Sequence, residues 1–194
     1  MKSVLLTAFE PYDRYPANAS WLTLIELTRA LPTDIKLTTR LYPVDYAAAR
    51  ELVQQDLLAE PDYAIHLGQA PGSGRLRLEA TGLNASLRGQ THVPLLADGP
   101  AAYRTTLPLD QWIPPLRASG IPAEVSNHAG TFLCNALLYY SLHEAVVRGL
   151  RTQAFFLHVP LDVSQVLHDA ADTSCLPVEY SAAGLRLILS ELAK

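Results

Sequence analysis

Residues 122–159 read PAEVSNHAGTFLCNALLYYSLHEAVVRGLRTQAFFLHV. Residues 122–126 predict a short strand, and the apolar run over 131–148 predicts a long helix that ends at Gly149. The next segment, Gln153–Val159, is almost wholly apolar and predicts a buried strand. A strand, a helix and a second strand in this order form the unit from which α/β folds with parallel sheets are built.

The rest of the chain repeats this alternation of strands and helices. Further strands are predicted at residues 3–8, 35–41 and 63–67, and further helices at residues 21–31, 45–59, 109–119 and Val178–Leu192. We expect Ser20 and Asp45 to cap the first two helices. The sequence therefore predicts an α/β fold, a three-layer sandwich around a mostly parallel central sheet, in a single domain spanning residues 1–194.

Residues 76–108 depart from this pattern. Leu76 and Leu78 alternate with charged residues, which predicts a half-exposed strand, and residues 83–87 are expected to return as its hairpin partner. This hairpin is the expected antiparallel excursion from the main sheet. Residues 88–108 are rich in glycine and proline and predict a loop.

Composition excludes several classes of protein. The chain has 194 residues, of which 49% are hydrophobic and 18% charged, and a net charge of −4. Because no basic block occurs, we expect no nucleic-acid partner. No run approaches the roughly 20 apolar residues that a membrane span needs. The two cysteines lack regular spacing, and the short apolar start predicts a strand rather than a secretion signal, so we expect free thiols and a cytoplasmic location.

Two residues carry the candidate chemistry. Cys134 lies in the first turn of the predicted long helix, where the helix dipole and free N–H groups stabilise a thiolate and can bind an oxyanion. His158 lies at the end of a buried strand, where it can act as a general base. A carboxylate must orient that histidine; Glu79, Asp98 and Asp162 are candidates. From the residues alone, a buried structural cysteine and a core histidine remain the simpler readings.

A longer motif resolves this ambiguity by resemblance. Residues 120–135, GIPAEVSNHAGTFLCN, resemble the signature around the cysteine of the pyroglutamyl peptidase I family, also called pyrrolidone-carboxyl peptidases. The resemblance continues at residues 68–70 (GQA), 98–103 (DGPAAY) and 156–160 (FLHVP). These segments span nearly the whole chain in the same order as in the family.

The resemblance implies a cysteine exopeptidase, or thiol protease, that removes an N-terminal pyroglutamyl residue from peptides. Its catalytic residues would be Cys134, His158 and Glu79. The resemblance also implies a set of substrate-binding residues: Phe9, Tyr12 and Phe132 around the flat lactam ring, with Gln69, Asn18 and, near the oxyanion, Arg88. It further implies a cytoplasmic homo-oligomer, a dimer or a homotetramer, with a peptide substrate and with no metal or organic cofactor.

The chain departs from the family in the loop after the first strand. Asp13 and Arg14 stand where the family has two glycines, so we expect this loop to sit differently over the ring pocket. Two alternatives follow: a related cysteine amidase that acts on another small acyl group, and a non-catalytic relative that binds pyroglutamyl ligands. A metal site is disfavoured because no H-E-x-x-H or C-x-x-C spacing occurs; His168 and Asp169 are merely adjacent.

Overall fold

The central feature of the computed structural model, which describes residues 1–167 and 172–194, is a six-stranded sheet in the order β2-β1-β3-β10-β4-β9. Its strands are β1 (Lys2–Phe9), β2 (Ile35–Tyr42), β3 (Tyr63–Gln69), β4 (Leu76–Glu79), β9 (Ala123–Ser126) and β10 (Gln153–Val159). Neighbouring strands are parallel except at the β10–β4 pair, which is antiparallel. The predicted α/β class with a mostly parallel sheet is confirmed.

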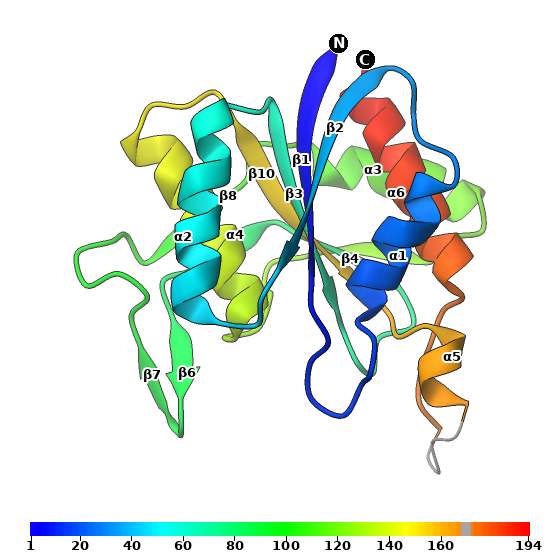
Figure 1. The fold of residues 1–194 in the computed structure, drawn as a ribbon, viewed down its shortest axis with the longest axis horizontal. Helices are drawn as coiled ribbons and strands as arrows, with labels where there is room; N and C mark the ends of the chain where they lie inside the picture. Colours follow the sequence, from blue (N-terminus) through cyan, green and yellow to red (C-terminus); the bar gives the residue numbers. More distant parts are fainter. Residues whose placement is uncertain (168–171) are drawn as a thin grey trace.

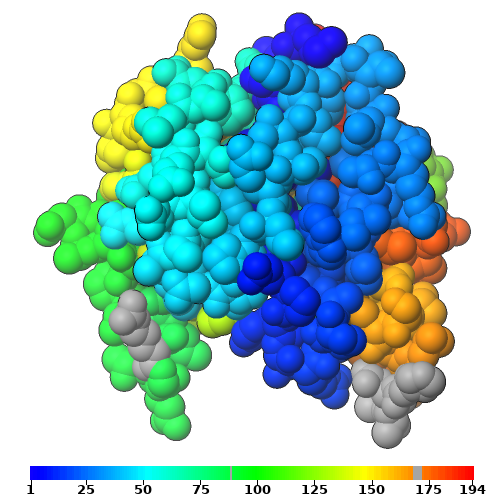
Figure 2. Space-filling model, viewed as in Figure 1, coloured from blue at the N-terminus to red at the C-terminus, as the bar shows by residue number. Residues whose placement is uncertain are grey.

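Helices cover both faces of the sheet (Figure 1). On one face lie α1 (Ala19–Thr28), α3 (Leu109–Ala118) and α6 (Val178–Leu192); on the other lie α2 (Tyr46–Asp56) and α4 (Leu133–Val147). The 3₁₀ turn η1 (Leu57–Ala59) extends α2, and the short α5 (Val163–Val166) follows β10. In the space-filling view, α1, β2 and α2 cover the upper part of one face, and a green segment projects below α2 at the lower left (Figure 2).

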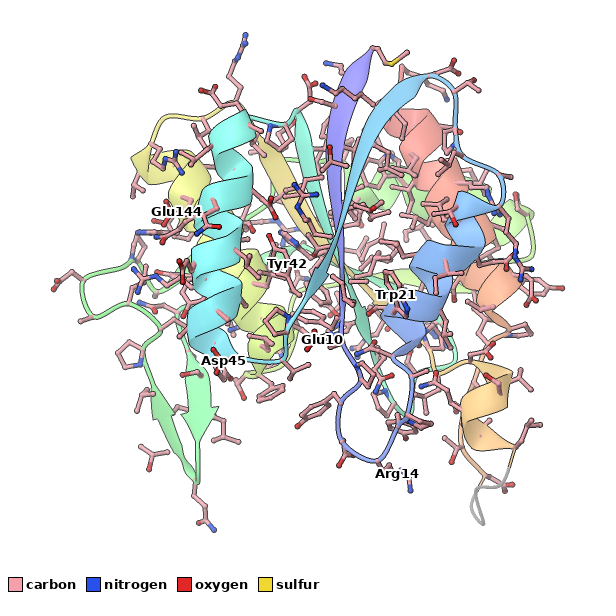
Figure 3. The ribbon with its side chains drawn as sticks, in the orientation of Figure 1. Glu10, Arg14, Trp21, Tyr42, Asp45 and Glu144 are labelled. Atoms are coloured by element: carbon pink, nitrogen blue, oxygen red, sulfur yellow. The ribbon has the colours of Figure 1, made fainter. Side chains whose placement is uncertain are left out.

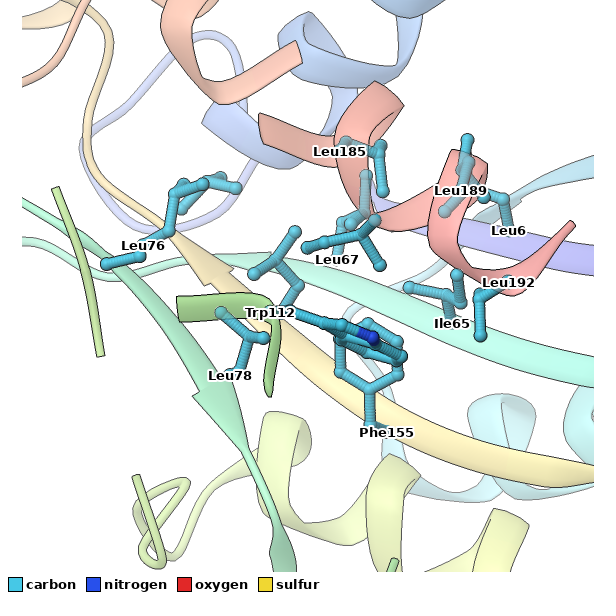
Figure 4. Close-up of a cluster of buried hydrophobic side chains, with 14 of the residues drawn as sticks. Leu6, Ile65, Leu67, Leu76, Leu78, Trp112, Phe155, Leu185, Leu189 and Leu192 are labelled. Atoms are coloured by element: carbon cyan, nitrogen blue, oxygen red, sulfur yellow. The ribbon is translucent and has the colours of Figure 1, made fainter. Parts of the chain in front are cut away.

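Each face of the sheet has its own hydrophobic cluster. Neighbouring residues of β10 point to opposite faces, so that Phe155 packs against Trp112 of α3, with a ring separation of 5.5 Å, while Phe156 belongs to the cluster under α4. Figure 4 shows Phe155 beside Trp112, with Leu185 and Leu189 of α6 packing on the same face of the sheet. Burial on both faces explains why the strands are nearly continuous apolar runs.

The first helix begins earlier than expected, at Ala19, and its N-cap is Asn18 rather than Ser20. The Asn18 side chain accepts a hydrogen bond from the Ser20 N–H at 3.1 Å. The Ser20 hydroxyl instead accepts from the Phe9 N–H at 3.1 Å, which joins the helix to the end of β1. Asp45 caps α2 as predicted, because its side chain accepts from the Ala48 N–H at 2.8 Å (Figure 3).

The predictions for residues 76–108 are wrong in two respects. β4 is not a half-exposed hairpin strand: it is inserted between β10 and β9, where Leu76 and Leu78 are fully buried. Residues 83–87 do not pair with it. The segment instead forms small antiparallel ribbons with residues expected to be loop: β5 (Thr81–Leu83) with β8 (Ala102–Arg104), and β6 (Ser86–Arg88) with β7 (Thr91–Val93). Local sequence could not show the pairing of β4 or β5, because their partners are distant in the chain, whereas the β6–β7 hairpin joins neighbouring segments.

Candidate active site

A buried histidine and a buried carboxylate meet across the antiparallel β10–β4 pair. His158 lies opposite Arg77, and Phe156 lies opposite Glu79, so all four side chains point to the α4 face of the sheet. The diagonal neighbours His158 and Glu79 form a hydrogen bond of 2.8 Å between Nδ1 and Oε1. Because Nδ1 donates to the carboxylate, the ring orientation is fixed and Nε2 is left to interact with Cys134.

The Glu79 side chain has no other hydrogen bond within the described part of the chain. Its side chain is fully buried, and its Oε2 atom lacks a partner. The following residue, Ala80, cannot donate a side-chain hydrogen bond, whereas an arginine at this place could. His158 is therefore the main group that balances the charge of this carboxylate.

Cys134 is the second residue of α4, and no side chain caps that helix. The Ala136 N–H donates to the Phe132 carbonyl at 3.1 Å, while the N–H groups before it belong to the turn that has no partner within a helix. Asn135 holds this end of α4 in place: it accepts from the Leu83 N–H at 2.8 Å and donates to the carbonyls of Leu83 and Ala85 at 2.9 and 2.8 Å. The thiol thus lies where a helix terminus favours negative charge.

Gly68 makes room for the thiol. It lies beside His158 in the parallel β3–β10 pair. A Cβ atom at this position would lie 3.0 Å from the Cys134 sulfur and 2.6 Å from the Phe156 ring. A larger residue could not fit there without displacing one of them.

The charge state of His158 depends on both neighbours. Burial by itself lowers the pKa of His158, but the Cys134 thiolate and the Glu79 carboxylate favour the imidazolium more strongly and raise the pKa from 6.5 to about 9. At neutral pH His158 is therefore protonated, as an imidazolium beside the Cys134 sulfur. An imidazolium in this place can stabilise a sulfur nucleophile and supply a proton to a leaving amine.

Cys134 and His158 line a largely apolar pocket of about 340 Å³, while Glu79 lies buried behind His158. Tyr12 and Phe132, which are 44% and 42% exposed, lie 5.3 Å apart between ring centroids at its mouth. Phe9 is 4% exposed and packs against Phe156 at 6.3 Å. A pocket with aromatic walls suits a small, flat, uncharged group.

Asn18 and Gln69 also line the pocket, but hydrogen bonds hold both side chains in the scaffold. Asn18 caps α1 and donates to the Glu10 carbonyl at 3.0 Å. The Gln69 carbonyl oxygen accepts from the Ala19 N–H at 3.1 Å. These bonds fix the wall of the pocket that faces α1.

Asp13 in the pocket rim has a φ of 57°, in the left-handed region that glycine favours. Aspartate is among the side chains that enter this region most readily. Asp13 therefore adopts the kind of backbone turn that a glycine would provide. Arg14 follows it at the outer tip of the β1–α1 loop (Figure 3).

The other candidate partners of His158 lie elsewhere. The Asp162 carboxylate caps α5, where it accepts from the Ser164 N–H at 3.0 Å and from the Val178 N–H at 2.9 Å. Burial alone would raise the pKa of Asp162, but these bonds keep it below the usual value. Arg88 is part of β6, and its side chain lies outside the described structure; so do His168 and Asp169.

Arg77 and His128 line the pocket although sequence reasoning did not select them. Arg77 precedes Glu79 by two residues, and this spacing places both on one face of a strand. Residues 1–167 and 172–194 contain no cluster of three or more potential metal ligands. Over the same residues, no helix is long and apolar enough to cross a membrane.

A cysteine at a helix terminus, beside a histidine oriented by a carboxylate on an α/β sandwich, defines a cysteine peptidase. The family model of pyroglutamyl peptidases matches residues 2–193. The chain belongs to the pyroglutamyl peptidase family.

Individual relatives agree with this assignment. Pyrrolidone-carboxylate peptidase 1 of Ralstonia nicotianae is 31% identical, over 97% of this chain and 92% of its own length. The pyrrolidone-carboxylate peptidase of Chromobacterium violaceum is 35% identical, over 96% of this chain and 90% of its own. The crystal structure of the pyrrolidone carboxyl peptidase from Fervidobacterium islandicum superposes with a TM-score of 0.93 at 33% identity, covering 99% of this chain and 98% of that one.

Proposed function

We propose that this chain removes the N-terminal pyroglutamyl residue from peptides, with Cys134 as nucleophile, His158 as general base and acid, and Glu79 as the residue that orients His158. The observation that carries the proposal is the position of Cys134 at the start of α4, beside the buried His158–Glu79 pair and inside an apolar pocket. Family membership supplies the substrate class.

The reaction follows from this geometry. The Cys134 thiolate attacks the carbonyl carbon of the pyroglutamyl residue, and the carbonyl oxygen becomes an oxyanion. We expect the uncapped N–H groups at the start of α4 to stabilise that charge. The His158 imidazolium then gives its proton to the leaving amine, which breaks the C–N bond and leaves a thioester. A water molecule, deprotonated by His158, hydrolyses the thioester.

The lactam ring would lie among Phe9, Tyr12 and Phe132. Aromatic faces suit a flat five-membered ring, and the uncharged amide needs no ion pair. Asn18 and Gln69 hold the polar groups of the pocket wall that faces α1 in place. For Arg88, a position near the oxyanion is proposed from the family resemblance alone.

Three further points belong to the same proposal. The chain acts as one hydrolase domain over residues 1–194, since both hydrophobic clusters share one sheet. It works in the cytoplasm, which agrees with the free thiols of Cys134 and Cys175. It forms a homo-oligomer, a dimer or tetramer, and needs no metal or organic cofactor.

The chain offers a matched control for the test. We would assay the purified protein on a pyroglutamyl-coumarin amide at about pH 7–8, beside Cys134→Ser and Cys175→Ser. We expect activity in the parent and in Cys175→Ser, and none in Cys134→Ser or after thiol alkylation. If the parent protein is folded and reduced but does not cleave this substrate, the proposal is refuted. A panel of other N-acyl amides would then identify a related amidase, and tight binding without turnover would identify a non-catalytic relative.

A further inference from the structure

We propose, on the basis of the proposed function, that Arg77 is a specificity-determining residue that binds a carboxylate on the leaving side of the scissile bond. The carboxylate would be either the α-carboxylate of a pyroglutamyl dipeptide or the side chain of an acidic second residue. The catalytic residues and the ring pocket do not account for this arginine.

The position of Arg77 follows from strand order. Across the sheet the order is β1-β3-β10-β4. Phe9 and Gln69, on the ring-pocket side, lie on β1 and β3, His158 lies on β10, and Arg77 lies opposite His158 on β4. Neighbouring strands are about 4.8 Å apart. Arg77 is therefore one strand beyond the histidine, on the side away from the lactam ring.

The proposed reaction places the leaving peptide on the Arg77 side of His158. His158 must protonate the leaving amine, so the second residue of the peptide has to lie next to His158 and away from the ring. An arginine side chain that begins one strand away can reach the first residue after the scissile bond. The substrate group nearest Arg77 is therefore on the leaving peptide.

A polar hollow continues from the active-site pocket in the same direction. Ala70, Pro71 and Arg77 line both the 340 Å³ pocket and a second hollow of about 700 Å³. The second hollow is also lined by Arg75 and Glu124. The apolar pocket thus opens, beyond the thiol, onto a charged surface on which a peptide can continue.

The charges around this hollow do not balance. Glu124 pairs with Arg77 at 3.2 Å and with Arg75 at 3.2 Å, so one carboxylate serves two guanidinium groups. The Arg77 side chain is 39% exposed, so a ligand can reach it, and the contact of its buried Nε atom with Glu124 lacks hydrogen-bond geometry. Of the charged residues that line this hollow, two are positive and one is negative. A guanidinium with free donors binds a carboxylate best, often through two parallel hydrogen bonds.

Two pairs of substrates separate the possible sources of the carboxylate. Pyroglutamyl-alanine against its amide tests the α-carboxylate, and the amides of pyroglutamyl-glutamate and pyroglutamyl-glutamine test the side chain. We expect the parent to favour the charged member of at least one pair by about 5-fold in kcat/KM, or about 1 kcal/mol. About 1 M NaCl should reduce the preference, because it shortens the screening length.

Three variants assign the preference to Arg77. Arg77→Ala should bring the ratio close to one, and Glu124→Gln should raise it, because it removes the competing carboxylate. Arg151→Ala is the matched control: Arg151 is exposed and precedes β10, at the opposite end of the strand from His158, so it should leave activity and ratio unchanged.

Two results would overturn the inference. One is a parent without preference in either pair; the other is a preference that survives Arg77→Ala. If the parent cleaves none of the substrates, the proposed function fails instead, and the inference is then judged on binding. Calorimetry with the Cys134→Ala variant should show tighter binding of the pyroglutamyl-glutamate amide than of the glutamine amide, and Arg77→Ala should remove the difference.

Discussion

The substitution Gly68→Ala tests how closely the thiol, the histidine and the sheet are packed. Gly68 has no positive φ, so alanine is compatible with its backbone, and only the added methyl group matters. That Cβ would lie 2.6 Å from the Phe156 Cζ atom and 3.0 Å from the Cys134 sulfur. Ordinary carbon contacts are about 3.5–4.0 Å, so the ring has to move by about 1 Å.

The Phe156 ring cannot make this movement alone. It is fully buried, and its centroid lies 6.3 Å from that of Phe9 and 4.8 Å from that of His158. A shift of the ring therefore displaces His158 or the thiol. Misplacing catalytic groups by about 1 Å can cost about 10²-fold in rate, and we expect kcat/KM to fall by about that factor.

Stability should change less than activity. Overpacking destabilises a protein by about 1–3 kcal/mol. Replacing glycine by alanine also reduces the conformational freedom of the unfolded chain, which stabilises the folded protein by about 0.4–1 kcal/mol. We therefore expect the free energy of unfolding, measured with urea, to fall by about 1–2 kcal/mol. Turnover of the pyroglutamyl-coumarin amide is measured where the variant is fully folded.

Gly74→Ala is the matched control, since its Cβ would meet only the Ser174 Cβ at 3.9 Å. It should change neither stability nor turnover appreciably. If Gly68→Ala keeps kcat/KM within about twofold of the parent, the Phe156 ring yields without moving His158 or Cys134. The reasoning from packing would then be refuted.

Four further predictions follow from individual residues. Because His158 loses its proton near pH 9, kcat/KM should fall as the pH rises through about 9. Glu79→Gln removes a charge that favours the imidazolium, so this fall should move to lower pH, and activity should drop on the order of 10²-fold. An unchanged pH profile in Glu79→Gln would contradict the pairing of Glu79 with His158. His66 is buried with both ring nitrogens hydrogen-bonded, and burial lowers its pKa from 6.5 to about 3. As the pH falls, the unfolded chain protonates His66 before the folded protein does. The free energy of unfolding in urea should therefore fall from pH 6.5 towards 3 by up to about 1.4 kcal/mol per pH unit, more steeply than in His66→Gln. If the parent and His66→Gln lose stability in parallel, His66 does not contribute to the pH dependence. Asn135→Ala should cost about 3 kcal/mol in the same assay, because three hydrogen bonds to partly buried backbone groups are lost. A cost below about 1 kcal/mol would show that water replaces them. Glu60→Gly should gain about 0.5–1 kcal/mol, because Glu60 has a φ of 45°; a loss would mean that its side chain stabilises the turn.

The residues that could be read from sequence are those whose surroundings are local. The amphipathic and apolar periods of α4, α6 and β10 depend on neighbours a few residues away, so these elements were predicted nearly to their ends. The place of Cys134 at a helix start follows from the same local pattern. Where two adjacent residues could both cap a helix, as at Asn18 and Ser20, local pattern did not distinguish them.

The ring-pocket residues show a second limit. Phe9, Tyr12 and Phe132 were predicted from the family resemblance. The fold brings all three to one pocket, although Phe9 and Tyr12 lie near the N-terminus and Phe132 lies at the start of α4. Asn18 and Gln69 also reach it, but their hydrogen bonds to the scaffold could not be foreseen. Side-chain partners of this kind depend on elements that are distant in sequence.

By itself, the sequence determined the α/β class, the main helices and strands, and a cysteine at a helix terminus, because the period of apolar residues and the helix dipole act over short distances. Only the tertiary structure decided where β4 goes. Its insertion between β10 and β9 turns a strand that looks half exposed into a buried one. That insertion puts Glu79 diagonally across from His158 and Arg77 directly opposite it. Strand pairing is long-range: the partners are 79 residues apart in the Glu79–His158 bond, and no local pattern encodes which strands will become neighbours.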